Sequence, residues 1–350
     1  MTASTLPRDK ASQWGVPLWF PLLAGILYAC PIWLVPYYSL LDHANYANHV
    51  RDWATILSSA SIVSLPFREP LWFLSLGAIG AILPPEETIR FISVTSAFAF
   101  AAMIGRHYRA QPLAVALILS FPLLIINHLG AIRQGVALTV FLAGFLSQKK
   151  HQRWTLMSIA PFIHVGFFII LALWVSAWRI NRLRFSPYLK TATIAALCLA
   201  MAVAIPIASL VIGTRQSGNY ELFEARGSGL AFAFWAMILL LFVAAGRDFI
   251  TKHLFSISVI LLYLSMYWLV PIAGRTFEAG LVFVLLSGFS LPHAKRLLFI
   301  LAISAYSVML WAGLWDKPWL GLTVPQVAQD QHSPVQAPNS PDRTSDVGPT

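Results

Sequence analysis

The stretch "NHLGAIRQGVALTVFLAGFLS", residues 127–147, sets Arg133 in front of fourteen residues that carry no further charge. On membrane-insertion scales, a charged side chain at the centre of an apolar helix costs roughly 2.5–3.5 kcal/mol. Ionisable groups inside such segments are for this reason candidates for a functional role. The stretch therefore predicts a membrane-embedded segment that keeps its arginine for a ligand or a partner.

The composition extends this interpretation to the whole chain. Of the 350 residues, 58% are hydrophobic and 11% are charged, and the mean hydropathy is +0.70. Soluble domains carry about 25% charged residues. Windows of roughly 20 apolar residues, the length of a spanning helix, recur along the chain. The sequence predicts an all-α, polytopic transmembrane bundle of about 10–12 membrane segments, including re-entrant ones. A cleaved signal peptide is not expected, because the first apolar run is long and has no clear cleavage site.

The apolar segments define one membrane domain, residues 1–315, and a tail. Residues 38–69 form a polar outer loop with an expected interfacial helix, because Val50, Trp53 and Leu57 fall at helical spacing. Residues 316–350 are rich in Pro, Gln, Ser and Asp and are expected to be disordered. The predicted apolar segments are 17–37, 70–84, 88–105, 112–127, 131–147, 154–177, 189–213, 229–246, 254–272, 275–291 and 296–314.

The net charge of +10 comes from short basic clusters between apolar runs. These clusters favour cytoplasmic anchoring under the positive-inside rule, and not nucleic-acid binding. All of them lie on one side of the membrane if residues 70–84, a short run, and part of 154–177, a run that Pro161 is expected to break, are re-entrant or half-spanning. This topology places residues 38–69, Arg133, residues 214–228 and Arg275 together on the outer face. The clusters are residues 106–109, 148–153, 179–184, 247–253 and 293–296.

The outer face collects polar side chains that could carry chemistry. Structural alternatives stand beside the functional ones: Glu69 could cap a helix, His164 could be a satisfied core residue, and Glu278 could pair with Arg275. No P-loop, nucleophile elbow or H-E-x-x-H motif is present, and neither the acidic residues nor the two cysteines suggest a metal site. We therefore expect no metal and no cofactor. The candidates are Asp42, Tyr46, Arg68, Glu69, Arg133, Gln134, His164, Arg215, Tyr220 and Arg275.

The order of these motifs resembles the EpsG family of exopolysaccharide polymerases, which are Wzy-like membrane glycosyltransferases. The resemblance covers roughly residues 37–290, and "RQ-x-x-A" with the downstream His is its most specific part. Two departures are "EPLW", where the family reads "EPGY", and Val165-Gly166, where a small hydroxyl residue often follows the His. The matching motifs are D-x-x-x-Y at 42–46, "REP" at 68–70, "IRQGVAL" at 132–138, "FIHVGF" at 162–167, a loop Tyr at 220 and "GR" at 274–275.

The resemblance implies a GT-C-like bundle in the bacterial inner membrane, multi-pass, with its active site facing the periplasm. The implied substrate is an oligosaccharide repeat unit on undecaprenyl pyrophosphate, polymerised by an inverting or retaining transfer. Implied partners are membrane lipids, a chain-length regulator and export machinery. His164, Asp42 and Glu69 are candidate catalytic groups, with His164 first because the ordinary pKa of imidazole is near about 6.5. Asp42 ranks second, and Glu69 is expected to hold Arg68 or the acceptor sugar. The implied substrate-binding residues are Arg133, Gln134, Arg68, Tyr46, Arg215, Tyr220 and Arg275, since arginine forks suit phosphate oxygens.

Two other functions fit part of the pattern. A flippase or exporter of lipid-linked oligosaccharides would also show intramembrane arginines, but along a cavity through both leaflets, and often with repeat symmetry. We find no internal repeat in the sequence. A polysaccharide O-acyltransferase would use His164 as its base, yet it would need a path for an acyl donor, and the sequence shows none.

Overall fold

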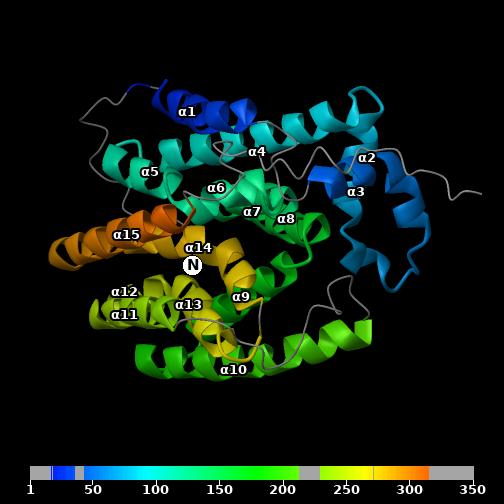
Figure 1. The fold of residues 1–350 in the computed structure, drawn as a ribbon. Helices are drawn as coiled ribbons and strands as arrows, with labels where there is room; N and C mark the ends of the chain where they lie inside the picture. Colours follow the sequence, from blue (N-terminus) through cyan, green and yellow to red (C-terminus); the bar gives the residue numbers. More distant parts are fainter. Residues whose placement is uncertain (1–16, 18, 36–42, 213–228, 271, 315–350) are drawn as a thin grey trace, which may run out of the picture.

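The computed structural model describes residues 17, 19–35, 43–212, 229–270 and 272–314, and all regular secondary structure in these ranges is helical (Figure 1). The predicted all-α class is confirmed for this part of the chain. Asp42, Arg215, Tyr220 and the tail 316–350 lie outside the described residues. The elements are α1 Phe20–Leu34, α2 His43–Ser58, η4 Leu65–Arg68, α3 Pro70–Gly80, α4 Pro85–His107, α5 Pro112–Leu119, α6 Pro122–Leu129, α7 Ile132–Leu146, α8 Lys150–Ile163, α9 Phe167–Asn181, α10 Pro187–Ile212, α11 Leu230–Ala244, α12 Arg247–Lys252, α13 Leu254–Met266, α14 Ala273–Gly288 and α15 His293–Leu314.

Three of the described helices are long and apolar enough to cross a membrane: α4, the first 19 residues of α10, and α15. The bent pair α5–α6 makes a fourth if it counts as one span. Six further apolar helices have only 10–17 residues. A 15-residue helix such as α7 is roughly 22 Å long, shorter than a hydrocarbon core of about 30 Å. The described part of the chain therefore has three or four helices that could span a membrane, together with apolar helices that are shorter than a full span.

Several helices begin at a proline, and one of these prolines, Pro122, divides a predicted segment into two helices. Residues 112–127 do not form one helix: the chain turns by 55° between α5 and α6. Pro122 opens α6, and Phe121 before it is extended, with φ −71° and ψ 120°. Proline has no N–H to donate and disfavours helical geometry in the preceding residue, so the helix is interrupted there.

The predicted segment 154–177 is likewise two helices, and its break is not at Pro161. Pro161 lies inside α8, which continues to Ile163. The chain then becomes extended at His164, with φ −146° and ψ 120°, and α9 begins at Phe167. At this break the N–H of Val165 has no helical carbonyl partner. It donates instead, at 3.2 Å, to the Glu69 side chain, which is distant in the sequence.

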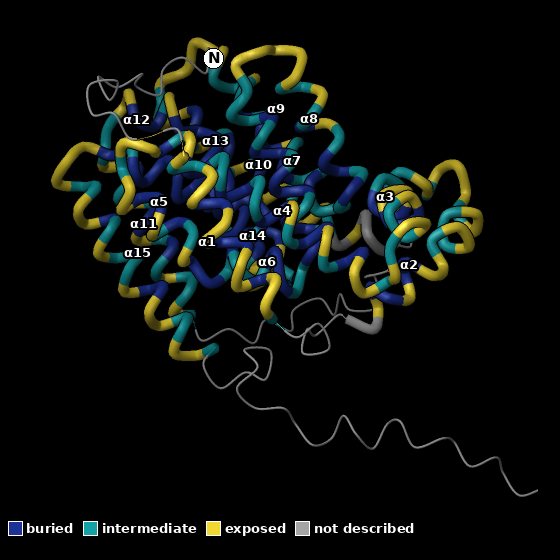
Figure 2. Tube along the Cα trace, turned by 90° about the horizontal axis from the view of Figure 1, so that it is seen from above, coloured by how far each residue is buried: buried dark blue, intermediate teal, exposed yellow. Residues whose placement is uncertain are grey.

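The middle of the molecule is built from α7 and α14, and α14 is buried along nearly its whole length (Figure 2). Layers of helices lie on both sides, with α1 and α4 at one edge and α10 at the other (Figure 1). Gly288 at the end of α14 lets α15 approach, because a Cβ there would lie 2.0 Å from the Phe299 ring. Cores of this kind tolerate little added volume.

The basic clusters and Glu69 lie at opposite ends of the helical bundle. Helices α4, α7, α9 and α14 end next to residues 106–109, 148–153, 179–184 and 293–296. Contacts between Tyr108 and Leu286 and between Trp154 and Trp178 bring these ends together. The fifth cluster joins them, because His253 hydrogen-bonds Ser287 at the far end of α14. The described part of the chain thus carries its basic clusters at one end and the candidate site at the other. The side of the membrane on which each end lies stays a prediction.

Candidate functional site

Glu69 has an unusual backbone at the junction of η4 and α3. Its φ of 58° and ψ of 52° are left-handed, and it is the sole non-glycine residue with positive φ in the described ranges. Such a conformation costs about 1–3 kcal/mol and concentrates at functional sites. Glu69 is the N-cap residue of α3, as the structural alternative expected, but its side chain makes no capping hydrogen bond to that helix.

The Glu69 carboxylate joins three helices. One oxygen, Oε1, lies 2.7 Å from Nδ1 of His164 and accepts the N–H of Val165 at 3.2 Å. The other, Oε2, accepts a hydrogen bond from Nη1 of Arg133 and forms an ion pair with it. The whole residue is 5% exposed. The start of α3, the start of α7 and the end of α8 therefore meet on one carboxylate.

The electrostatics of this cluster keep Glu69 ionised. Burial by itself raises the pKa of a carboxyl group, but the Arg133 charge and the bonds from His164 and Val165 outweigh it. Together they lower the pKa of Glu69 to about 2. A carboxylate with so low a pKa is a poor proton acceptor near neutral pH. Within this cluster Glu69 is suited to hold its neighbours and not to take a proton.

Arg133 is held by a second group besides Glu69. Its guanidinium carbon lies 5.9 Å from the centroid of the Tyr46 ring, within cation–π range. Tyr46 comes from α2, is 3% exposed, and packs edge-on against Trp72 of α3 at 5.7 Å. The structure thus brings Tyr46 to the cluster, but as a neighbour of Arg133 in the protein interior.

His164 presents its other ring nitrogen to the outside of the cluster. Its side chain is 14% exposed, and in the described part of the chain Nε2 is neither buried nor hydrogen-bonded. The space beside Nε2 exists because residue 166 is glycine, where a Cβ would lie 3.3 Å away. His164 is therefore not a fully satisfied core residue: one nitrogen is fixed and the other is open.

Gln134 follows Arg133 in α7, and a separate set of hydrogen bonds connects it to the backbone of Arg275. The buried amide of Gln134 donates to Oδ1 of Asn127, at 3.1 Å, and to the backbone oxygen of Arg275, at 3.3 Å. Asn127 in turn donates to the backbone oxygen of Glu278 at 3.5 Å. These bonds fasten the start of α14 to α6 and α7. The Arg275 side chain is exposed, and no described salt bridge joins it to Glu278.

Sequence reasoning overlooked two contributors to this region and misassigned one. It did not select Asn127, although that residue is polar within an apolar run, and no local pattern marks the N–H of Val165 as a ligand of Glu69. Arg68 was a suggested partner of Glu69, but it is exposed, and Glu69 binds Arg133 and His164. No three His, Cys, Asp or Glu side chains gather as metal ligands within the described ranges.

No family model matches this chain, and neither a curated protein nor a solved structure matches it. The site geometry and the sequence motifs are therefore what a functional proposal rests on.

Proposed function

We propose that this chain is a Wzy-like polysaccharide polymerase of the EpsG type, with a GT-C-like fold, in the bacterial inner membrane. It transfers oligosaccharide repeat units from undecaprenyl pyrophosphate on the periplasmic side, during exopolysaccharide biosynthesis. A chain-length regulator and export machinery are its proposed partners. The observation that carries the proposal is the cluster of Glu69, Arg133 and His164, in which an arginine and an open imidazole share one buried carboxylate.

The carboxylate prepares His164 to act as a base. When Nδ1 of His164 donates its hydrogen to Glu69, the neutral ring carries its lone pair on Nε2. The same carboxylate–imidazole arrangement orients the base in serine hydrolases. In the proposed reaction Nε2 takes the proton of the acceptor hydroxyl while that oxygen bonds to the anomeric carbon of the donor sugar. Glu69, already ionised, stabilises the imidazolium that forms.

Arg133 would stabilise the pyrophosphate leaving group. As the bond between the anomeric carbon and the pyrophosphate oxygen breaks, negative charge grows on that oxygen. A guanidinium has five N–H donors, and Glu69 accepts from Nη1 of Arg133, so other donors can face a phosphate. Arg68 and Arg275, both exposed, are further proposed contacts for the lipid pyrophosphate or the sugars, with Gln134 and Tyr46 holding the surroundings. Asp42, Arg215 and Tyr220 stay proposed members outside the described residues.

The position of the cluster at one end of the bundle supports a lipid-linked substrate. The cluster lies where α3 and α7 begin and α8 ends, at the end of the bundle opposite the basic clusters. A pyrophosphate at a bilayer surface would meet a cation there without leaving its lipid environment. Arginine at one end of the bundle agrees better with transfer at one surface than with a flippase cavity through both leaflets.

The test is polymer formation by the purified full chain from lipid-linked repeat units. We expect His164→Gln, which keeps hydrogen bonding but cannot act as a base, to lose at least about two orders of magnitude of turnover. The matched control is His151→Gln, because His151 is exposed at the opposite end of α8. A folded His164→Gln protein with near-normal turnover would remove His164 from the mechanism. Failure of the wild type to polymerise such substrates would overturn the proposed function.

A further inference from the structure

An apolar groove runs along α1, away from the cluster around Glu69. It has a volume of about 480 Å³, within the range of roughly 300–1,000 Å³ found for ligand sites. Four helices line it, and its lining is almost entirely hydrocarbon. Its walls include Leu27 of α1, Ala116 of α5, Ile125 of α6 and Trp311 of α15.

The polar groups at this groove already have partners. The Tyr28 hydroxyl donates to the backbone oxygen of Leu124 at 3.0 Å, and the indole N–H of Trp311 donates to that of Ser120, also at 3.0 Å. The groove therefore offers apolar contact to a ligand and no specific hydrogen bonds. It extends with the 15 residues of α1, roughly 22 Å, which exceeds the roughly 15 Å depth of one bilayer leaflet. A single hydrocarbon chain fits this shape.

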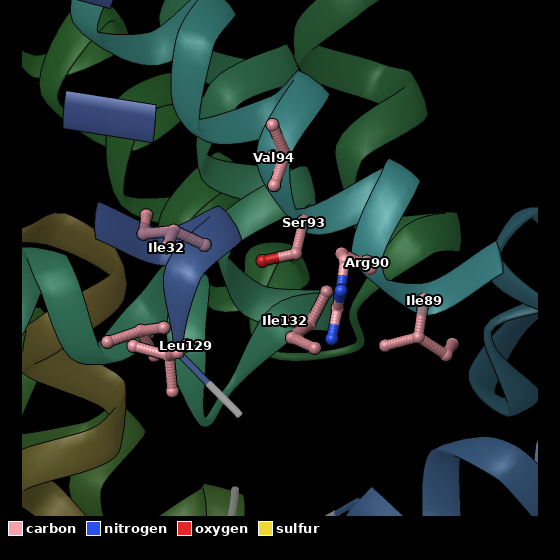
Figure 3. Close-up of a pocket in the computed structure, with 8 residues that line it drawn as sticks. Ile32, Ile89, Arg90, Ser93, Val94, Leu129 and Ile132 are labelled. Carbon is pink, nitrogen blue, oxygen red and sulfur yellow. The ribbon is translucent and has the colours of Figure 1, made fainter. Parts of the chain in front are cut away.

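One end of the groove leads to an arginine. Ile32, Val35 and Leu129 line both the groove and a notch of about 10 Å³, which has room for about one water. The rest of this notch is formed by Ile132 of α7 and by four residues of α4, namely Ile89, Arg90, Ser93 and Val94 (Figure 3). The Ser93 hydroxyl already donates to the backbone oxygen of His128. Arg90 is therefore the charged group that a ligand in the groove would meet.

Arg90 differs from Arg133 in its counter-charge. Within the described residues no carboxylate lies within 4.0 Å of Arg90, although Glu86 and Glu87 are one turn earlier on α4. Its guanidinium instead lies 5.4 Å from the Trp33 ring, which fixes its direction. Arg133 is neutralised by Glu69, whereas Arg90 keeps a full positive charge at the end of an apolar groove.

We propose that this groove binds one acyl chain of an anionic glycerophospholipid, with the lipid phosphodiester on Arg90. A phosphodiester carries a single negative charge, which one arginine balances, whereas a pyrophosphate carries two or three. Arg90 also lies in the first turns of α4, at the end of the bundle that carries the candidate site and that the proposed topology puts at the membrane surface. This lipid site is distinct from the cluster around Glu69, and its failure would leave the proposed function standing.

Photo-crosslinking of the full chain tests the proposal. Phosphatidylglycerol and phosphatidylcholine, each with a photoactivatable group in one acyl chain, are reconstituted with the protein, and adducts are mapped by peptide mass spectrometry. We expect phosphatidylglycerol adducts on α1 and α5 to exceed phosphatidylcholine adducts. Arg90→Gln should reduce this preference about fivefold, while Arg90→Lys, which keeps the charge, should retain most of it. The matched control is Arg106→Gln, an exposed arginine at the other end of α4.

A second pair of variants tests the groove itself. Ala116→Trp fills it from an exposed position on α5 and should remove the groove adducts. Ala196→Trp, at an exposed position on α10, should leave them unchanged. Thermal stability of each variant checks folding.

Three results would overturn the proposal. The first is equal labelling of the groove by the two phospholipids. The second is competition by a polyprenyl diphosphate but not by unlabelled phosphatidylglycerol, which would assign the groove to the donor lipid. The third is absence of lipid adducts in a folded protein, as expected if the chain itself or a second copy covers the groove.

Discussion

Nδ1 of His164 lies 2.7 Å from Oε1 of Glu69, although 95 residues separate the two in the sequence. The same carboxylate holds Arg133, so an imidazole and a guanidinium are positioned by one group. The loss of Glu69 should therefore disturb both neighbours at once. The predictions below separate the roles of the three residues.

Arg133→Lys keeps the positive charge but not the planar fork. Lysine is a point cation, so it cannot hold the Glu69 carboxylate and a phosphate together as a guanidinium can. We expect polymer formation to fall at least about tenfold at an unchanged protein level. The measurement is polymer length and amount from lipid-linked repeat units. Near-normal polymer from the lysine variant would exclude a phosphate-binding role for Arg133.

Glu69→Gln should lower stability at neutral pH, because it leaves Arg133 without its counter-charge in a poorly hydrated place. Breaking a buried pair in this way costs roughly 3–5 kcal/mol. The pKa of Glu69 in the folded protein, about 2, lies below its ordinary value of 4.5. Stabilisation by the Glu69 charge is thus complete above pH 4.5 and is lost as the pH falls towards 2.

Thermal melting of wild type and Glu69→Gln across pH is the measurement. The difference between their melting temperatures should hold at neutral pH and shrink only below pH 4.5. Equal melting temperatures at neutral pH would show that the Glu69 charge does not support the fold.

Gly166→Ala should slow the reaction without unfolding the protein. The new Cβ would lie 3.3 Å from Nε2 of His164, tight enough to narrow the approach of an acceptor hydroxyl. Gly313→Ala is the control, because a Cβ there has no neighbour within 4 Å. We expect about a tenfold loss of turnover for the first and little change for the second. Equal turnover of the two variants would mean that Nε2 does not face the acceptor.

The proposed topology puts the candidate site outside and the basic clusters inside. Single cysteines replace Ser61, which is exposed before η4, and Lys149, which precedes α8. A membrane-impermeant thiol reagent should label the cysteine at position 61 from the periplasm and spare the one at 149. Cys30 is exposed, and each variant therefore also carries Cys30→Ser. Labelling of both positions from the same side would refute the topology.

Hydropathy and proline placement determined much of the helical architecture. Apolar runs near 20 residues implied membrane helices, and the long helices α4 and α15 follow predicted segments closely. Proline at the first position of α3 and α5 matched predicted starts, because proline fits the first turn of a helix. Arg133 and His164 stood out for the same local reason, as ionisable groups in apolar surroundings. These properties depend on residues within a few positions of one another.

The partners of those groups were decided by the tertiary structure. Glu69 binds across 64 residues to Arg133 and across 95 to His164, and no pattern around Glu69 distinguishes this from a helix cap. The break at His164 also has a distant component, since the N–H of Val165 bonds to the Glu69 carboxylate instead of a carbonyl one turn back. Ionisable groups that are costly to bury can be recognised in the sequence from their apolar neighbours. Which counter-charge offsets that cost depends on how α3, α7 and α8 pack against one another, because charge pairing acts through space and not along the chain.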